Sequence, residues 1–370
     1  MITPEEIGAI DWEGSRSHFF INPRTPDSEK EEFLKLLRSA SHLNSHCFLL
    51  TSGTTGKKKW VALAHHALLS SAAAVNRHLQ VSSRDIWINP LPVFHVGGLS
   101  IYVRAKLSGS RVVSVNSGRW DMEGFIKSCE AEKGTLSALV PTQVYDCVQA
   151  GIKAPASLRA VVVGGGALNE AIYESAVCLG WPLLPSYGLT ECSSQVATAL
   201  LGSWMAGHFP ELPFLDHVET GFNPEGYLQI RSEALLTAYV GEEGVCDPKK
   251  EGWFSTEDRI TLGERGVVNV SRGTGFVKIG GESVDLQRLQ QILEGVCIKQ
   301  RTPISCAIAA KPDLRKGSVI ELLVEGTVDP LALVEQFNQQ VLPFERICHV
   351  THVKTLPRTA LGKILIRACR

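Results

Sequence analysis

The segment TSGTTGKKK, at residues 51–59, brings hydroxyl groups, glycines and lysines together in one short stretch. Small residues let backbone N–H groups converge, hydroxyls add donors and a lysine adds positive charge, a combination that suits a phosphate group. A Walker A loop needs four residues between its two glycines, whereas Gly53 and Gly56 enclose only two. The segment therefore predicts a phosphate site other than a P-loop, and an ordinary solvated turn is the alternative.

Other side chains along the chain could complete such a site. Glu191 follows a Tyr-Gly turn, where a carboxylate can hold a Mg²⁺ ion that bridges phosphates. Tyr187 offers an aromatic face to adenine, and the glycines at 164–166 let a base or an acyl group approach the backbone closely. The alternatives are a core tyrosine, a turn before a helix and, for Asp258 and Arg272, a surface ion pair.

These residues need elements that position them. The apolar run HCFLL before residue 51 predicts a strand that leads into the phosphate segment. Further apolar runs lie at 136–141, 158–166 and 181–188, with a helical pattern between the last two. Such alternation indicates largely parallel sheets covered by helices.

The pattern of apolar and polar residues changes from about residue 226. Period-2 segments broken by Gly and Asp indicate an antiparallel β region there. After SRGTG at 271–275 we expect a compact tail with a helix at 285–295 and two strands. The glycines around 273 and 275 are the expected hinge between the two parts.

Composition limits the classes of function. A chain of 370 residues with 44% hydrophobic and 20% charged residues predicts a soluble globular protein of more than one domain. The net charge of -1 gives no general reason to bind nucleic acid or an acidic membrane, so an anion site must be local. Ten cysteines without a CxxC pair indicate reduced thiols. With neither a leader-like start nor a long apolar stretch, we expect a cytoplasmic protein without a membrane span.

From about residue 47 to its end, the chain resembles adenylate-forming enzymes, the superfamily of acyl-CoA synthetases, luciferases and peptide-synthetase adenylation domains. Seven signatures carry the resemblance in the family order: TSGTTGKKK, PLPVFHVGG at 90–98, VVVGGGAL at 161–168, SYGLTE at 186–191, GWFSTEDR at 252–259, SRGTGFVKIGGESVD at 271–285 and PRTALGKI at 357–364. The resemblance implies an α/β fold: a large N-terminal domain of β-sheets flanked by helices at 1–272, and a small mobile α+β domain at 273–370.

The resemblance also implies ATP, Mg²⁺ and CoA as the cofactor set, and roles for single residues. The implied catalytic residues are Thr54, His95, Glu191 and Lys363, with Glu191 as the metal ligand. In the family, the residues that match Asp258 and Arg272 reach the ribose. The implied nucleotide-binding residues are Thr51, Ser52, Gly53, Thr55, Gly56, Lys59, Gly164, Gly165, Gly166, Tyr187, Gly188, Thr190, Asp258 and Arg272.

The implied chemistry has two halves. A carboxylate attacks the α-phosphate of ATP to give acyl-AMP and pyrophosphate, and CoA thiolate then displaces AMP to leave a thioester. Lys363 matches the family lysine that reaches the reacting carboxylate and the α-phosphate, although a lysine near a C-terminus is otherwise usually solvated. In the family the small domain swings between the halves and presents instead a face that matches Gly280, Gly281 and Glu282.

The segments FHVGGLSIYVRAKLSGSRVV, LVPTQVY and CSSQ resemble 2-succinylbenzoate-CoA ligases of menaquinone biosynthesis. In that subfamily an arginine placed as Arg104 suits the second carboxylate of the substrate, since a guanidinium pairs with a carboxylate at two points. A snorkelling arginine at a helix edge is the alternative. The weaker candidates for substrate contact are Thr142, Ser194 and Gln195, and His95 matches a histidine that gates the acyl pocket.

Several positions depart from the family pattern. Lys58 and Trp60 replace a usual Pro and Gly of the loop, Thr274 replaces the hinge aspartate, and Leu286 and Gln290 replace residues of the following helix start. Because relatives usually carry about a hundred more residues before the loop, we expect a reduced N-terminal subdomain. This length leaves the pocket wall and the packing of the sheets open.

Two histidine patterns do not predict a metal site. His349 and His352 fall on opposite faces of one expected strand, and His65 and His66 are adjacent at the start of an expected helix. The expected partners are a small carboxylic acid, ATP and CoA, with homodimer formation left open. Two alternatives remain: a ligase for another aromatic or medium-chain carboxylate, and a non-catalytic nucleotide- or acyl-binding protein.

Overall fold

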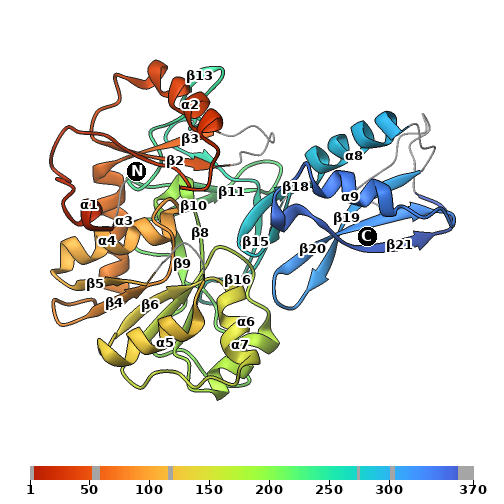
Figure 1. Ribbon diagram of the computed structural model, residues 1–370. Coiled ribbons are helices and arrows are strands. Elements are labelled where there is room, and N and C mark those ends of the chain that lie inside the picture. Colours follow the sequence, from red (N-terminus) through yellow and green to blue (C-terminus); the bar gives the residue numbers. More distant parts are fainter. Residues whose placement is uncertain (1–3, 52–58, 116–119, 273–275, 301–304, 357–370) are drawn as a thin grey trace. The chain divides into compact units, whose positions relative to one another are not determined.

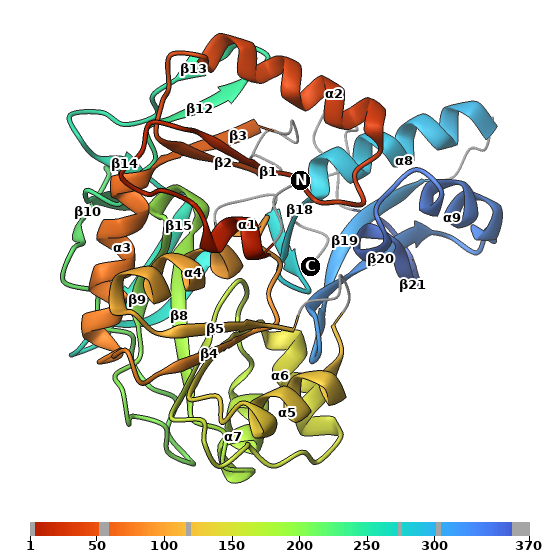
Figure 2. The ribbon, with the colours of Figure 1, turned by 60° about the vertical axis from the view of Figure 1, so that its left-hand side comes forward.

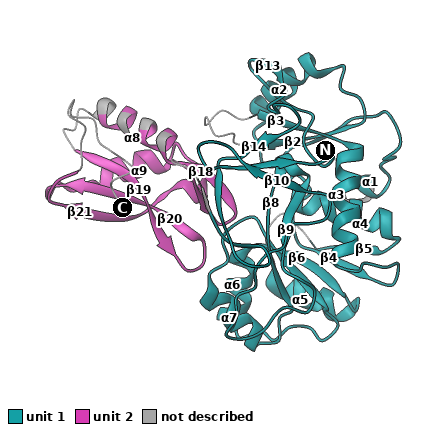
Figure 3. Cartoon of the chain, turned by 180° about the vertical axis from the view of Figure 1, so that it is seen from behind, with its two compact units in different colours: residues 1–53, 57–271 teal, residues 54–56, 272–370 magenta. Residues whose placement is uncertain are grey.

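The computed structural model describes residues 4–51, 59–115, 120–272, 276–300 and 305–356. The chain forms two compact units, the first of residues 1–53 and 57–271 and the second of residues 54–56 and 272–370 (Figure 3). A compact unit need not fold or move independently, so the division into domains 1–272 and 273–370 stays a proposal.

A six-stranded sheet forms the lower part of the first unit in Figure 1. Its first five strands are parallel, and the last is antiparallel to its neighbour. In spatial order the strands are β5 (Arg111–Ser114), β4 (Ile86–Asn89), β6 (Leu136–Leu139), β7 (Ala160–Val163), β8 (Leu183–Leu189) and β9 (Ser194–Thr198). The three apolar runs of the sequence correspond to β6, β7 and β8, which confirms the predicted parallel arrangement.

Helices cover both faces of this sheet. Val162 of β7 packs into one core cluster with residues of α3 and α4, while Val161 and Val163 pack into a second cluster with residues of α5, α6 and α7. Helices α3 and α4 lie side by side (Figure 2). The helices are α3 (His65–His78), α4 (Val96–Ser108), α5 (Met122–Ala131), α6 (Pro141–Gln149) and α7 (Glu170–Cys178).

A five-stranded sheet carries the phosphate segment. Strand β2 (His46–Thr51) enters the segment and β3 (Lys59–Ala64) leaves it antiparallel to β2, as the apolar run before residue 51 predicted. The remaining strands are β1 (His18–Phe20), β12 (Ala238–Gly241) and β13 (Gly244–Cys246). The helices before β2 are α1 (Pro4–Gly8), α2 (Asp27–Leu36) and the 3-10 helix η1 (Leu37–Ala40).

The region after residue 226 is antiparallel, as predicted. Strands β10 (Glu219–Phe222), β11 (Leu228–Arg231) and β14 (Phe254–Ser255) form one small sheet, and β15 (Asp258–Leu262) and β16 (Val267–Arg272) form another. The 3-10 helix η2 (Thr190–Cys192) follows β8. Across the part of the chain that the structure describes, the helices are all too short or too polar to cross a bilayer.

The second unit contains more strands than the two that the sequence predicted. A hairpin of β17 (Phe276–Ile279) and β18 (Glu282–Asp285) precedes α8 (Leu286–Gln300). Three strands follow that helix, β19 (Cys306–Asp313), β20 (Gly317–Glu325) and β21 (Ile347–Val353), together with α9 (Leu331–Asn338) and the 3-10 helix η3 (Pro343–Glu345). The hairpin is short, and its Gly-Gly turn, where both φ angles are positive, resembled a loop in the sequence.

Candidate active site

The phosphate segment lies between the end of β2 and the start of β3. Thr51 and Lys59, which flank residues 52–58, are paired across the two strands. Ser52, Gly53, Thr54, Thr55 and Gly56 lie outside the described residues, as does the side chain of Thr51. The predicted phosphate contacts of this loop therefore stay predictions.

Lys59 extends from the loop toward a tyrosine of the neighbouring strand. Its Nζ lies 3.3 Å from the centroid of the Tyr239 ring, and the hydroxyl of Tyr239 donates a 2.9 Å hydrogen bond to Oε1 of Glu191. Burial lowers the pKa of Lys59, and the negative charges of Glu191 and Glu257 act in the opposite direction. The structure thus brings the predicted residues Lys59 and Glu191 to one tyrosine that the sequence interpretation did not include.

The turn that carries Glu191 has an unusual backbone. Ser193 and Ser194 have φ angles of 55° and 122°, values that residues other than glycine rarely adopt. A Cβ added at Gly188 would lie 1.8 Å from the carbonyl oxygen of Ser194, so only glycine fits at this position. Thr190 begins η2, and the backbone N–H of Leu236 donates a 2.8 Å hydrogen bond to the carbonyl of Glu191. The conformation of this turn is therefore held by the close approach of Gly188 to Ser194 and by the hydrogen bond from Leu236 to Glu191.

Tyr187 and Asp258 are in direct contact. The tyrosine hydroxyl donates to Oδ2 of Asp258 over 2.8 Å, and both side chains are buried. Burial and then the negative charge of Asp258 raise the pKa of Tyr187, so the hydroxyl stays protonated as a donor. Thr256 fixes the start of β15, because its Oγ1 accepts a 3.1 Å hydrogen bond from the backbone N–H of Asp258. These two predicted residues therefore belong to one cluster.

The three predicted glycines follow the carboxyl end of β7. Gly165 has a φ of 79°, and a Cβ at Gly164 would lie 3.0 Å from Oγ of Ser186 on β8. Gly166 continues the same turn toward α7. Ligands bind at the carboxyl ends of strands in open α/β sheets, and this turn belongs to that edge.

Arg104 is one of the largest fully buried side chains, with 1% of its surface exposed. Its Nη2 donates to Oγ of Ser194 over 3.3 Å. A guanidinium is only a donor, so the carbonyl of Gln195 must face it, which places Oε1 at 3.0 Å from Nη2 and 3.3 Å from Nη1. The same amide then donates from its nitrogen to Oγ1 of Thr198 at 2.5 Å.

Burial is the cause that lowers the pKa of Arg104, to about 9. Among the described residues the arginine has no ion pair with a carboxylate, and its Nε has no hydrogen-bond partner. The ring of Trp87 lies 5.8 Å from the guanidinium carbon. A buried positive charge whose partners are neutral amide and hydroxyl groups is costly unless an anion approaches it.

Two further predicted residues, His95 and Thr142, lie at the starts of helices. His95 is exposed at the start of α4, with its ring centroid 4.7 Å from that of Phe94. Thr142 lies in the first turn of α6, after β6. Among the described contacts, none links either residue to Arg104, so their proposed roles rest on the sequence.

The remaining predicted residues belong to the second unit. Gly280 and Gly281 form the turn between β17 and β18, with φ angles of 61° and 92°, and Glu282 begins β18. The side chain of Arg272 and all of Lys363 lie outside the described residues, as does Thr274. The CoA-step and lysine proposals therefore stay sequence-based.

Tyr239 and Thr256 are the residues that the sequence interpretation missed. Thr256 lies inside the quoted signature GWFSTEDR, two positions before Asp258, which was the available signal. Tyr239 lies in a period-2 strand where an aromatic side chain is expected to pack against its neighbours. Its partners are distant in the sequence, so only the register of β12 against β3 reveals its role.

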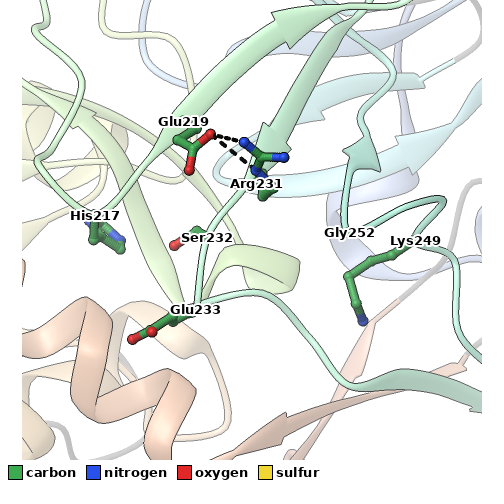
Figure 4. Close-up of a pocket in the computed structure, with 7 residues that line it drawn as sticks. All are labelled: His217, Glu219, Arg231, Ser232, Glu233, Lys249 and Gly252. Atoms are coloured by element: carbon green, nitrogen blue, oxygen red, sulfur yellow. Dashed lines mark hydrogen bonds and ion pairs between the residues drawn. The ribbon is translucent and has the colours of Figure 1, made fainter.

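A surface pocket of about 410 Å³ in the first unit lies apart from these residues (Figure 4). Both lining cations have acidic partners, because Arg231 Nε donates to Oε2 of Glu219 over 3.0 Å and Lys249 lies 2.8 Å from Asp247, which is outside the lining. Burial lowers the pKa of His217 to about 4, so this lining residue is neutral at physiological pH. The pocket contains no residue of the predicted site.

The candidate metal ligand is a single carboxylate. Within the described ranges, no group of three or more His, Cys, Asp or Glu side chains is placed to hold a metal. This arrangement fits Mg²⁺ better than Zn²⁺, since Mg²⁺ is commonly held by one or two carboxylates together with phosphate oxygens and water. The histidine patterns behave as predicted, because His349 and His352 lie three residues apart in β21 and His65 begins α3.

Solved structures confirm the predicted fold. A double mutant of o-succinylbenzoate CoA synthetase from Bacillus subtilis is similar at a TM-score of 0.71, with 23% identity over 87% of this chain and 68% of that one. The amide bond synthetase McbA from Marinactinospora thermotolerans is similar at a TM-score of 0.70, with 20% identity over 88% of this chain and 69% of that one. Both likenesses support the adenylate-forming fold.

Comparison of sequences identifies the family. A curated 2-succinylbenzoate--CoA ligase of Staphylococcus aureus strain Newman is 26% identical over 347 residues, which cover 90% of this chain and 69% of the relative. The model of the AMP-binding enzyme family matches residues 22–215, more than half of the chain. With this match added to the fold and the clustered residues, the chain belongs to the AMP-binding enzyme family.

Proposed function

We propose that the protein is an AMP-forming acid–CoA ligase whose acid is 2-succinylbenzoate. The observation that carries the choice of acid is Arg104, a buried cation whose described partners are the neutral groups of Ser194 and Gln195. A substrate with a second carboxylate would supply the missing anion. The curated Staphylococcus aureus relative, named for the same reaction, supports the proposal.

The nucleotide would lie between the Tyr187–Asp258 pair and the edge of the sheet that carries Lys59. Asp258 accepts from the tyrosine at Oδ2, and because a carboxylate can accept several hydrogen bonds, it would also accept from a ribose hydroxyl. The glycine turn at 164–166 leaves room for the base. Lys59 and the loop before it would contact the phosphates.

Glu191 would hold a Mg²⁺ ion, and a bound Mg²⁺ would neutralise phosphate charge. The structure of the Bacillus subtilis synthetase in complex with ATP and a magnesium ion supports the use of MgATP. Oε1 of Glu191 already accepts a hydrogen bond from Tyr239, so the carboxylate keeps one orientation. That orientation leaves the carboxylate's further lone pairs available for a cation.

In the first step, an oxygen of the acid's carboxylate forms a bond to the α-phosphorus and the bond to pyrophosphate breaks. Lys363 would stabilise the charge on the reacting oxygens. In the second step CoA loses its thiol proton, the thiolate attacks the acyl carbon, and AMP leaves with the electron pair of the broken C–O bond. The turn of Gly280 and Gly281 would serve this second step.

The geometry refines how the second carboxylate would be recognised. Ser194 is partly buried whereas Arg104 is fully buried, and Nη2 of Arg104 donates to Oγ of Ser194, so a substrate carboxylate would meet Ser194 before the arginine. Ser194 would therefore donate the first hydrogen bond, with the charge of Arg104 directly behind it. A carboxylate there would favour the protonated guanidinium and offset the cost of burying it.

The free thiols support a reducing compartment, and we place the enzyme in the cytoplasm. All nine cysteines in the described ranges are free. The fold does not by itself set the oligomeric state, so a homodimer stays open.

Pyrophosphate release and thioester formation measured against a small panel of acids test the proposed function. The panel contains 2-succinylbenzoate, a substituted benzoate and a medium-chain fatty acid, each with MgATP and CoA. The proposal expects the highest kcat/KM for 2-succinylbenzoate and formation of its CoA thioester. A preference for a monocarboxylate would reject 2-succinylbenzoate as the acid but keep the assignment as a ligase. ATP binding without turnover of any acid would favour a non-catalytic role.

A further inference from the structure

Tyr239 contacts both of the predicted phosphate-handling residues, Lys59 and Glu191. Its ring lies under the ammonium of Lys59, with 3.3 Å from Nζ to the ring centroid, and its hydroxyl reaches Oε1 of Glu191 at 2.9 Å. The ammonium therefore approaches the face of the ring and the carboxylate approaches its edge. Each contact matches the charge distribution of a phenol, whose face is negative and whose O–H is a donor.

The sheet explains why these residues meet. Tyr239 of β12 is paired with Val61 of β3, which lies two positions beyond Lys59 and therefore on the same face. The diagonal neighbours are within reach of an aromatic and a long side chain. Gly241 adds no side chain between them, and a Cβ built there would lie 3.8 Å from Cβ of Lys59.

The partner of the hydroxyl is held in place independently. The carbonyl of Glu191 accepts from the backbone N–H of Leu236, three residues before Tyr239, and Oγ of Ser193 donates to the carbonyl of Ala234 over 2.8 Å. The turn after β8 is thus joined to the segment that becomes β12. With the backbones fixed, the Tyr239 hydroxyl selects one rotamer of the Glu191 carboxylate.

We infer that Tyr239 is a positioning residue for the ATP phosphates and their metal, acting through Lys59 and Glu191. The inference rests on the proposed use of MgATP, but it does not depend on which acid is activated. The phenol hydroxyl is placed as a donor to the carboxylate, and the ring face is placed against the ammonium. The hydroxyl holds the carboxylate while the ring holds the ammonium.

Two substitutions separate the two contacts. Tyr239→Phe removes the hydroxyl and keeps the ring, so it should affect only the Mg²⁺-dependent part of ATP binding. Tyr239→Leu removes both. Tyr227→Phe is the matched control. The guanidinium carbon of Arg259 lies 4.8 Å from the centroid of the Tyr227 ring, and the substitution keeps that ring while it removes a tyrosine hydroxyl.

The measurement is binding of ATP to the full chain by calorimetry, with and without Mg²⁺ and without any acid. We expect Tyr239→Phe to weaken the Mg²⁺-dependent part by about tenfold, as loss of a partner to a metal-binding carboxylate does. Metal-free ATP binding should be unchanged in that variant and weaker by about threefold in Tyr239→Leu, which also loses the cation–π contact. Tyr227→Phe should bind like wild type in both conditions.

The outcomes distinguish this inference from the proposed function. If the wild-type chain binds no ATP, the proposed function itself fails. If the wild type binds MgATP and Tyr239→Phe shows the same Mg²⁺ dependence, the positioning role of Tyr239 is rejected. Equal losses with and without Mg²⁺ in Tyr239→Phe would also reject it, because they indicate a general structural effect.

Discussion

The hydroxyl of Tyr187 donates a 2.8 Å hydrogen bond to Oδ2 of Asp258, although the two residues are 71 positions apart. Tyr187 lies in β8 of the six-stranded sheet, and Asp258 is the first residue of β15 in a separate small sheet. The bond joins the proposed adenine face to the proposed ribose acceptor. The nucleotide site is therefore partly assembled before a ligand binds.

This pairing predicts a difference between two variants. Asp258→Asn should raise the Kd for AMP by about tenfold or more, since it removes a charged acceptor for a ribose hydroxyl. Tyr187→Phe keeps the aromatic face and should cost less. Calorimetric titration with AMP checks the order, and a larger loss in Tyr187→Phe than in Asp258→Asn would contradict the assigned roles.

Glu191→Gln should shift the Mg²⁺ requirement of pyrophosphate release. The amide keeps an acceptor for the Tyr239 hydroxyl but removes the negative charge, so about tenfold more Mg²⁺ should be needed for half of the maximal rate. The rate is measured at fixed ATP over a series of Mg²⁺ concentrations. A variant with the wild-type Mg²⁺ profile would remove Glu191 from the metal site.

Lys363→Ala should separate the two half-reactions. Adenylate formation should fall by about 100-fold or more, because charge on the reacting oxygens loses its stabilising ammonium. Thioester formation from pre-made acyl-AMP and CoA should largely persist. Both rates are followed by the appearance of AMP and pyrophosphate, and equal loss of the two would indicate a folding defect instead of a role in adenylation.

A partly buried ion pair between Asp85 and Arg159, at the amino ends of β4 and β7, predicts a pH dependence of stability. Burial of Asp85 acts to raise its pKa, but hydrogen bonds from Arg159, Ser82 and Thr135 outweigh burial and hold the pKa at about 2. A carboxyl whose pKa is lower in the folded state stabilises the fold above its unfolded pKa, near 3.8, and the contribution disappears as pH falls through about 2.

Asp85→Asn should therefore lower the free energy of unfolding by about 2 kcal/mol at neutral pH. The difference between variant and wild type should shrink as the pH falls from about 4 toward 2. Urea unfolding at several pH values measures it, with Asp216→Asn as a control at an exposed pair with Arg77. A difference that stays constant down to pH 2 would be inconsistent with the ion-pair account.

The sequence predicted the elements whose burial pattern is simple. The apolar runs that became β6 and β7 are buried on both faces of the sheet, so their composition alone indicated a parallel sheet with helices on each side. The signature residues Tyr187 and Asp258 were also placed in the nucleotide site from the sequence. Their mutual contact was not predicted, because no local pattern pairs two strands of different sheets.

The parts that were missed depend on register and on backbone conformation. Tyr239 reaches Lys59 through the alignment of β12 with β3, and it reaches Glu191 through the hydrogen bond that joins Leu236 to Glu191, neither of which the sequence specifies. The positive φ angles of Ser193 and Ser194 were likewise hidden, since serine seldom adopts them and nothing in the composition marks them. Gln195 was proposed from family resemblance only as a weaker candidate for substrate contact, and its contact with Arg104 was not predicted.

We propose that Arg104 selects the acid that the enzyme takes. Losing one partner of a desolvated charge pair costs about 2–5 kcal/mol, so Arg104→Ala should lower kcat/KM for 2-succinylbenzoate by about 100-fold or more. A substituted benzoate has no second carboxylate, so its kcat/KM should barely change. Arg104→Lys should restore little, because an ammonium lacks the planar fork that contacts Ser194 and Gln195.

The decisive measurement is the ratio of kcat/KM for 2-succinylbenzoate to that for the benzoate, in wild type and in Arg104→Ala, at one concentration of ATP and CoA. Lys106→Ala, which removes an exposed cation from the same helix, is the control. We predict that the ratio collapses in Arg104→Ala and is unchanged in Lys106→Ala. Equal losses toward both acids in Arg104→Ala, or a wild type that does not use 2-succinylbenzoate, would contradict the proposed recognition of a dicarboxylate.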